Sequence, residues 1–189
     1  GAPEYFREQK RLGKIRYFGF SFHGSPDALE QMLARGPWDF VQIQLNYYDW
    51  FHGTARALYE ILREHDIPIM VMEPAHGGML ADLPEAGRNL LLTAKPGATA
   101  ASWAFQFLRT LPGIAVVLSG MSSLEQVKDN VQTFSHDKPL SEQEIALVRQ
   151  VSDVIHGLYA VPCTGCPYCC ADCPHQGDSA FLLAAFNQY

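Results

Sequence analysis

The five cysteines of this 189-residue chain all fall in one stretch near its end, between Cys163 and Cys173. Four of them follow the spacing C-x2-C-x2-C-x3-C and a proline comes directly after the last (Cys163, Cys166, Cys169, Cys173 and Pro174). Bacterial-type iron–sulfur proteins hold a [4Fe–4S] cube with the same run of residues. The spacing therefore predicts that these four thiolates bind one iron–sulfur cluster and that Cys170, which is out of step with them, does not.

Two other uses of the cysteines compete with a cluster. A structural zinc site pairs two C-x2-C knuckles across a loop of roughly 15–20 residues, whereas only three residues separate Cys166 from Cys170. A disulfide framework suits an even number of cysteines spread along a secreted chain. Here the number is odd, the cysteines are crowded together, and no signal peptide opens the sequence. We therefore expect reduced thiols, which fit the cytoplasm.

Composition and charge restrict the partners of the chain. Hydrophobic residues make up 48% of the sequence and aromatic residues 12%, enough for a sizeable core. The formal net charge of −6 argues against nucleic acid, because a surface that binds phosphates needs an excess of lysine and arginine. No apolar run approaches the roughly 18 residues that a membrane span requires, so we expect no membrane partner.

Apolar strands alternate with amphipathic helices along most of the chain. Four strands are predicted (15–22, 40–46, 67–72 and 114–118), and the helices are predicted over 25–35, 54–65, 99–110, 124–133, 141–156 and 180–189, with a further helix ending near 13. This alternation is typical of parallel β/α units. A complete (β/α)8 barrel of the TIM type needs eight strands and about 250 residues. We therefore predict a half-barrel of about four β/α units over 1–160, followed by a cysteine-rich loop and helix over 161–189, together a fragment of a larger protein.

Four short stretches at the predicted strand ends carry a family pattern. They are Gly19–Gly24, Val41–Tyr48, Met72–Gly78 and Ser119–Ser123, with Asn130 following the last. In this order they resemble the aldo/keto reductases, in particular the branch with a C-terminal ferredoxin-like iron–sulfur segment. The resemblance implies a (β/α)8 barrel that passes hydride between NAD or NADP and a small carbonyl or alcohol. The chain would then correspond to the last four barrel strands and the beginning of the iron–sulfur tail.

The resemblance implies a cofactor site without catalytic residues. The family's catalytic tyrosine, lysine, aspartate and histidine come from its first four strands, so we expect none of them in this chain. Ser21 and Gln42 would hold the nicotinamide carboxamide. Gly120 and Ser122 would meet the cofactor phosphates, where a helix N-terminus favours an anion, and Asn130 would face the adenine. Without the resemblance, Ser21 and Gln42 are polar residues at a barrel mouth and Ser122 is a helix N-cap.

Some positions depart from the family pattern or have no assigned role. Met72 stands where many members stack a tyrosine on the nicotinamide. Gln126 stands where members that prefer NADP place an arginine, which leaves the choice between NAD and NADP open. Asn46, Glu73 and His76 also follow predicted strands, where barrel sites are built, but their chemistry is unassigned.

Three hypotheses of function follow from these observations. The first is the C-terminal half of an iron–sulfur aldo/keto reductase, an oxidoreductase that is inactive alone. The second is an electron-transfer module in which the cluster serves a redox partner and the half-barrel is a non-catalytic scaffold. The third is an assembly protein, because four parallel strands leave two unpaired edges and an open apolar face. A homodimer or the missing N-terminal half would cover that face.

Overall fold

The computed structural model describes residues 1–135, 139–159, 161, 163, 168–171, 173–175 and 177–187. The chain forms two compact units. The first comprises Gly1–Pro74 and Leu108–Gly120, and the second comprises Ala75–Phe107 and Met121–Tyr189. The predicted division into segments 1–160 and 161–189 stays a prediction.

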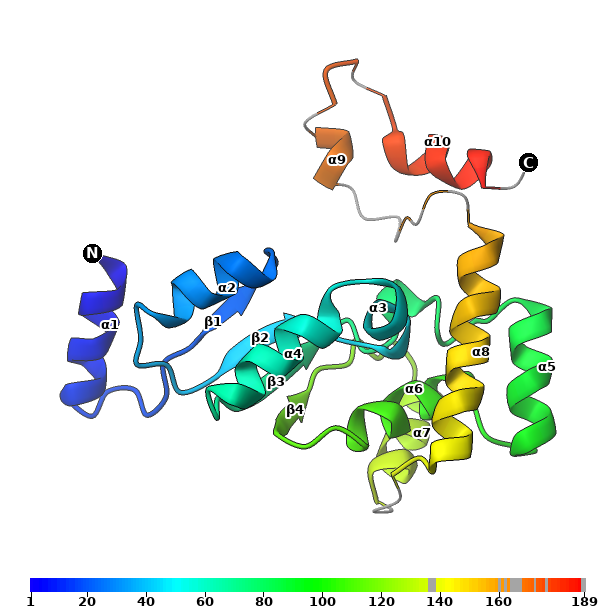
Figure 1. Ribbon diagram of the computed structural model, residues 1–189, viewed down its shortest axis with the longest axis horizontal. Helices are drawn as coiled ribbons and strands as arrows, with labels where there is room; N and C mark the ends of the chain where they lie inside the picture. The colour runs from blue at the N-terminus through cyan, green and yellow to red at the C-terminus, as the bar shows by residue number, and fades with distance from the viewer. Residues whose placement is uncertain are drawn as a thin grey trace. The chain divides into compact units, whose positions relative to one another are not determined.

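Within the described residues, the first unit is built on a four-stranded parallel sheet with the order β1–β2–β3–β4 (Figure 1). The strands are β1 (Phe20–Phe22), β2 (Val41–Gln44), β3 (Ile69–Met72) and β4 (Ile114–Val117). The parallel pairing of consecutive strands confirms the predicted β/α units. β1 is shorter than predicted, because the main-chain N–H of Phe18 donates to the Asp39 carboxylate (2.7 Å) instead of joining the sheet.

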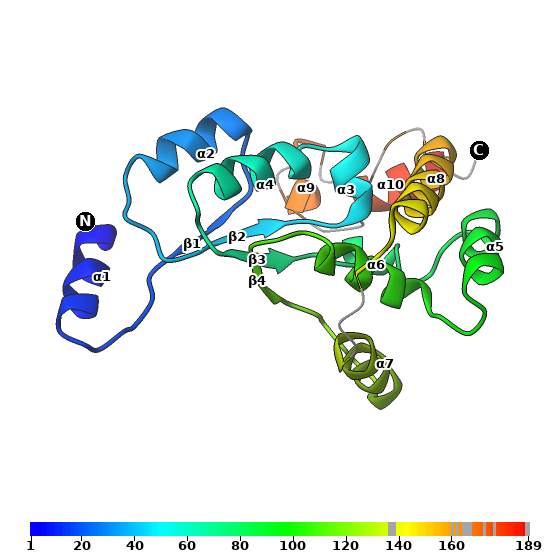
Figure 2. The same ribbon diagram turned by 60° about the horizontal axis from the view of Figure 1, so that its bottom comes forward.

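The two faces of the sheet differ in chemistry. Val41, Ile43, Ile69 and Val71 are fully buried. Helices α2 (Pro26–Leu33) and α4 (Ala55–Glu64) lie together on one side of the sheet, and α4 packs on β2 (Figure 2). Because side chains alternate along a strand, the residues between the buried ones point to the opposite face. That face carries polar and sulfur-containing side chains (Ser21, Gln42, Gln44, Met70 and Met72).

Serine side chains cap three of the described helices, and the cap of the helix that begins at Leu124 is Ser123 where the sequence analysis named Ser122. Ser25 accepts a hydrogen bond from the N–H of Ala28 (3.3 Å) at the start of α2. Ser123 accepts one from Gln126 (3.3 Å) at the start of α7 (Leu124–Ser135). Ser141 caps α8 (Glu142–Leu158) in a reciprocal pair with the third helical residue. The predicted helix over 99–110 is α6 (Ala100–Arg109), and the terminal helices are α1 (Ala2–Arg11) and α10 (Ser179–Phe186).

Three helices and a 3-10 turn were not predicted: α3 (Tyr47–His52), α5 (Glu85–Ala94), α9 (Tyr168–Ala171) and η1 (His76–Gly78). α3 is short and mostly aromatic, so it lacks a helical repeat of apolar residues. α5 contains Gly87, which has a low helix propensity, but tertiary packing compensates for it. A Cβ at Gly87 would lie 3.4 Å from Val151 Cγ1 on α8, so glycine lets these two helices pack closely.

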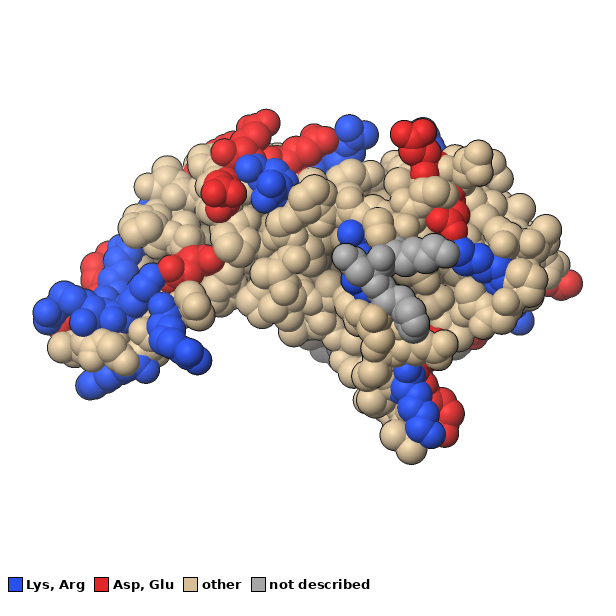
Figure 3. Space-filling model, turned by 90° about the horizontal axis from the view of Figure 1, so that it is seen from below, with Lys and Arg blue, Asp and Glu red and all other residues tan. Residues whose placement is uncertain are grey.

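Basic side chains gather over α1 and the loop after it, as the blue surface in Figure 3 shows, although the chain as a whole is acidic. Much of this charge is used inside the first unit. Lys10 forms an ion pair with Asp39 (2.5 Å) and Arg11 with Glu8 (2.6 Å). Arg7 lies over the ring of Trp38, 5.6 Å from its centre. The contacts of Lys10 and Arg7 fasten α1 to the segment before β2, whereas the pair of Arg11 and Glu8 lies within α1.

Exposed apolar side chains, as the sequence predicts, lie at the β4 edge of the sheet, on the same face as Met70 and Gln42. Val116 and Leu118 are 42% and 40% exposed, and within the described residues β4 pairs only with β3. Coverage of this face by a second copy or by an N-terminal half stays a prediction. None of the described helices is both long enough and apolar enough to cross a membrane.

A close approach of two main-chain segments requires glycine at position 19. A Cβ there would lie 2.2 Å from the carbonyl oxygen of Phe40, which belongs to the backbone and cannot turn away. We expect Gly19→Ala to lower the free energy of unfolding by about 1–3 kcal/mol, measured by urea denaturation. Gly157→Ala is the matched control, because nothing lies within 4 Å of a Cβ at that position. An unchanged urea midpoint for Gly19→Ala would contradict the close approach of the main chain at Gly19 to the Phe40 carbonyl.

Candidate functional site

Ser21 and Gln42 are register partners on neighbouring strands, and their side chains meet. The Gln42 Nε2 donates to Ser21 Oγ over 2.8 Å and lies 3.4 Å from Met72 Sδ. The parallel register explains this arrangement, since Ser21 pairs with Gln42 and Gln44 pairs with Met72. A glutamine amide offers two N–H donors and an acceptor oxygen, which is the complement of another carboxamide. The structure brings the predicted pair together, and its role toward nicotinamide stays a prediction.

A buried asparagine joins the ends of β2 and β3. The Asn46 Nδ2 donates to Asp49 Oδ2 (2.6 Å) and to the carbonyl oxygen of Glu73 (3.0 Å). Its Oδ1 accepts a hydrogen bond from the Asp49 N–H (2.9 Å), which caps α3. Gln44 Nε2 also donates to Asp49 Oδ2 (2.8 Å). Tyr47, the next residue, is buried, and this burial raises the pKa of its hydroxyl. The sequence left Asn46 without a role because the residues around it come from separate segments.

The predicted phosphate residues lie at the start of α7 and before it. The N–H groups of Ser122 and Ser123 both donate to Gln126 Oε1, over 2.8 Å and 3.2 Å. The Gln126 oxygen thus takes the place that a phosphate oxygen would need, and an anion would have to displace it. Gly120, in the first unit, has no atom within 4 Å of where a Cβ would be. Asn130 is half-buried on α7, further along the same helix.

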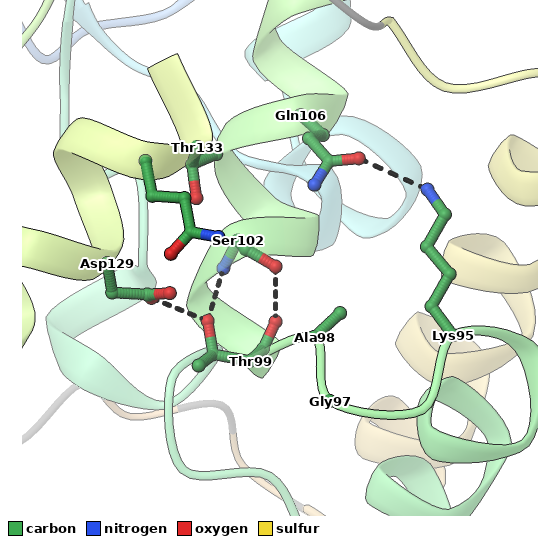
Figure 4. A pocket seen from close by; sticks show the side chains of 9 residues that line it. Lys95, Gly97, Ala98, Thr99, Ser102, Gln106, Asp129 and Thr133 are labelled. Carbon is green, nitrogen blue, oxygen red and sulfur yellow. Dashed lines mark hydrogen bonds between the residues drawn. The ribbon is translucent and has the colours of Figure 1, made fainter. Parts of the chain in front are cut away.

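The second unit contains a polar pocket that the sequence analysis missed (Figure 4). It measures about 280 Å³ and is lined by residues from α6, α7 and the loop before α6 (Lys95, Gly97, Ala98, Thr99, Ser102, Gln106, Asp129, Gln132 and Thr133). Thr99 Oγ1 donates to Asp129 Oδ2 (2.6 Å) and accepts from the Ser102 N–H (3.0 Å), which joins the two helices. The lining residues are isolated polar positions in the sequence. Asn130, predicted to face adenine, gave the only hint of a site near them.

Lys95 supplies the cation at one wall of this pocket. Its Nζ donates to Gln106 Oε1 (3.2 Å) and lies 4.7 Å from the centre of the Trp103 ring. It also forms an ion pair with Glu144 at the start of α8. Partial burial alone would raise the pKa of Glu144, but hydrogen bonds from Lys95 and Ser141 outweigh it and hold that pKa at about 2. Lys95 therefore connects α5, α6 and α8 through one charged group.

The described cysteines are not gathered as a cluster requires. Among the residues that the structure describes, no three histidine, cysteine, aspartate or glutamate side chains form a group that could hold a metal. Cys166, one of the four predicted ligands, lies outside the described residues. Cys170 has another partner, because its Sγ donates to Asp178 Oδ1 over 3.5 Å. Asp178 also accepts the Phe181 N–H (2.9 Å), and these two bonds lower the pKa of the Asp178 carboxyl.

The two ends of the cysteine-containing segment are joined by one side chain. Asn187, which ends α10, accepts from the Val161 N–H (3.0 Å) and donates to the Val161 carbonyl oxygen (2.8 Å). The side-chain amide of Asn187 thus pairs with both main-chain polar groups of a single residue.

Comparisons with known proteins give one consistent relationship. Residues 4–153 match the aldo/keto reductase family. The protein named "Uncharacterized oxidoreductase YqkF" from Bacillus subtilis (strain 168) is 23% identical over 163 residues, which are 75% of this chain and 52% of that protein. The holo form of aldo-keto reductase AKR11C1 from Bacillus halodurans is 27% identical with a TM-score of 0.63, over 78% of this chain and 54% of that one.

An aldo-keto reductase from Klebsiella pneumoniae, solved in complex with NADPH, is similar in fold. It is 22% identical with a TM-score of 0.61, over 79% of this chain and 52% of its own. The chain therefore spans about half the length of the relatives that it matches.

The Lys95–Glu144 pair predicts a specific dependence of stability on pH. A carboxyl whose pKa is about 2 in the folded chain and 4.5 when unfolded contributes stability above pH 4.5, and the contribution disappears as the pH falls toward 2. We expect Glu144→Gln to lower the free energy of unfolding by about 1–2 kcal/mol at pH 7 and by almost nothing near pH 2. Urea denaturation across this pH range measures the difference.

Glu142→Gln is the control for this experiment, because Glu142 is exposed on the same first turn of α8. It should change stability little at either pH. A constant gap between Glu144→Gln and the unmodified chain from pH 7 to pH 2 would contradict the depressed pKa of Glu144.

Proposed function

Because the chain belongs to the aldo/keto reductase family, we propose that it is the cofactor-binding part of an oxidoreductase acting on small carbonyl or alcohol substrates. The family match over residues 4–153 is the observation that carries this proposal. Two relatives agree with it by name, one as an oxidoreductase and one as a complex with NADPH. NAD or NADP would supply the hydride chemistry when bound, and the residues of this chain would hold and orient the cofactor.

The nicotinamide end is proposed to bind at the polar face of β1–β3. Gln42 can exchange hydrogen bonds with a carboxamide, and its contact with Ser21 fixes the direction of its amide. Met72 lies beside Gln42 and presents a polarisable sulfur of the kind that contacts aromatic rings favourably. These groups match both parts of the nicotinamide, its amide and its ring.

The phosphate and adenosine ends are proposed to bind at residues of the 120–133 stretch. Gly120 leaves room for a close approach, and the N–H groups of Ser122 and its neighbour would donate to a phosphate that displaces Gln126. Asn130 would face the adenine. The Lys95 pocket, which α7 also lines, has a volume of about 280 Å³ and offers amide, hydroxyl and charged groups to the adenosine.

We propose further that this chain is inactive on its own. Neither Ser21 nor Gln42, the residues proposed to hold the reacting nicotinamide, provides an acid or base for the reaction, and the family resemblance assigns that role to the first four barrel strands. The chain would correspond to strands five to eight. Activity would then require an N-terminal half, and the exposed residues of β4 are where a half-barrel or a second copy would pack.

A [4Fe–4S] cluster is proposed for the 161–189 segment on the spacing of its cysteines alone. Cys163, Cys166, Cys169 and Cys173 would be the ligands, and a reduced, cytoplasmic location would suit them. The hydrogen bond from Cys170 to Asp178 supports leaving Cys170 out of the set. An electron-transfer module that binds no nucleotide is the alternative, and the nucleotide titration below distinguishes the two.

The cofactor proposal predicts saturable binding of NADPH or NADH by this chain, without turnover. Gln42→Ala should weaken that binding about tenfold, because it removes hydrogen bonds to the carboxamide. Isothermal titration calorimetry measures the affinity. Gln143→Ala, at an exposed position of α8, is the control and should bind as the unmodified chain does. Absence of any saturable nucleotide binding would contradict the proposed function.

The cluster proposal predicts about four irons and four acid-labile sulfides per chain after anaerobic purification, with a broad absorption near about 400 nm. Replacing Cys163, Cys166, Cys169 or Cys173 by serine should abolish iron retention. Cys170→Ser is the matched control and should keep the iron. Zinc in place of iron, no metal, or equal loss of iron in Cys170→Ser would overturn the proposed ligand set.

A further inference from the structure

We propose that Asn46 is a positioning residue that holds the main chain after β3 in a left-handed conformation at Glu73. The inference rests on the proposed function only where it concerns the cofactor. Glu73 follows Met72, which contacts Gln42. The backbone held by Asn46 therefore adjoins the residues proposed to receive nicotinamide.

The Asn46 side chain has the burial and the contacts for this role. It is 0% exposed, and both its nitrogen and its oxygen are hydrogen-bonded. Its amide nitrogen donates to two acceptors, Asp49 Oδ2 and the carbonyl oxygen of Glu73. A buried donor left without an acceptor destabilises a fold. The Glu73 carbonyl must therefore stay in place for the Asn46 amide to remain satisfied.

The main chain at Glu73 adopts a conformation that is unfavourable without a stabilising contact. Its φ is 54°, in the left-handed region that a residue with a Cβ adopts only at a cost. Pro74 follows, and the residue before a proline prefers extended backbone. Local preference therefore opposes the observed conformation. The hydrogen bond from Asn46 to the Glu73 carbonyl acts directly on this residue.

Further hydrogen bonds connect the end of β3 to β2. Gln44 and Asn46 both donate to Asp49 Oδ2, so the carboxylate links the polar face of β2 to the first turn of α3. The Leu45 N–H donates to the Met72 carbonyl oxygen (3.2 Å), one residue before Glu73. A shift of Asn46 would thus move the end of β3 relative to Gln42 and Gln44. If Asn46 only capped α3, its movement would leave the end of β3 in place.

A double-mutant cycle separates positioning from capping. Asn46→Ser keeps an oxygen that can cap α3 but removes the donor to Glu73. Glu73→Gly lets position 73 adopt positive φ at no steric cost. In the chain that retains Asn46, we expect Glu73→Gly to raise the folding equilibrium constant about threefold. In the Asn46→Ser variant the backbone has already relaxed, so the gain should vanish or reverse.

Asp66 provides a matched control for the cycle. Its φ is 52°, and its N–H donates to the Arg63 carbonyl after α4. Asp66→Gly should change the equilibrium constant by the same factor in the unmodified chain and in the Asn46→Ser variant. If Glu73→Gly also gives the same factor in both backgrounds, Asn46 does not hold the backbone of Glu73 and the inference is overturned.

A nucleotide titration tests the consequence for the cofactor. Asn46→Ser should weaken NADPH binding about tenfold but leave adenosine 2′,5′-bisphosphate, which lacks nicotinamide, unchanged. Equal weakening of both ligands would overturn the positioning role toward nicotinamide. If the unmodified chain binds neither ligand, the proposed function is overturned, and the folding cycle by itself decides whether Asn46 holds Glu73.

Discussion

The parallel register of β2 between β1 and β3 is the constraint on which the rest of the first unit depends. It places Gln42 opposite Ser21 and Gln44 opposite Met72, so polar side chains from adjacent strands meet on one face of the sheet. A slip of one residue would turn Gln42 toward α2 and α4 and expose Val41. Burial of the apolar residues on one face therefore determines which polar residues converge on the other. Asn46 then fixes the ends of the strands, where a barrel builds its site.

The second unit depends on a single charge in a similar way. Lys95 ends α5, lies over Trp103 of α6 and pairs with Glu144 of α8. All of these contacts involve the single ammonium group of Lys95. Its removal would therefore weaken the packing of α5, α6 and α8 at the same time. The same group forms a wall of the pocket. In the second unit Lys95 both connects the helices and lines the pocket. In the first unit these two roles are divided, because Asn46 connects the strands and Gln42 faces the proposed ligand.

Local patterns in the sequence were sufficient for the strands and for most helices. Apolar runs marked β3 and β4, and the serine caps of α2 and α8 could be predicted because capping involves residues close in sequence. α5 was missed because its Gly87 is favourable only against α8, and the Lys95 pocket because its walls come from distant segments. Ser21 and Gln42 could be chosen only through the family resemblance, and the parallel register explains why the two side chains meet. The cysteine spacing predicts a cluster, but Cys163, Cys169 and Cys173 are not gathered into one in the described part of the chain.

The most direct test of the central claim is an NMR titration that follows the Gln42 side-chain amide as NADPH is added. If the polar face of β1–β3 receives nicotinamide, the two Nε2 protons of Gln42 will shift in a saturable way, because a new acceptor competes with Ser21 Oγ. Adenosine 2′,5′-bisphosphate should leave those protons unmoved. Saturable binding of NADPH with no change at Gln42 would contradict the account and would place the nicotinamide elsewhere.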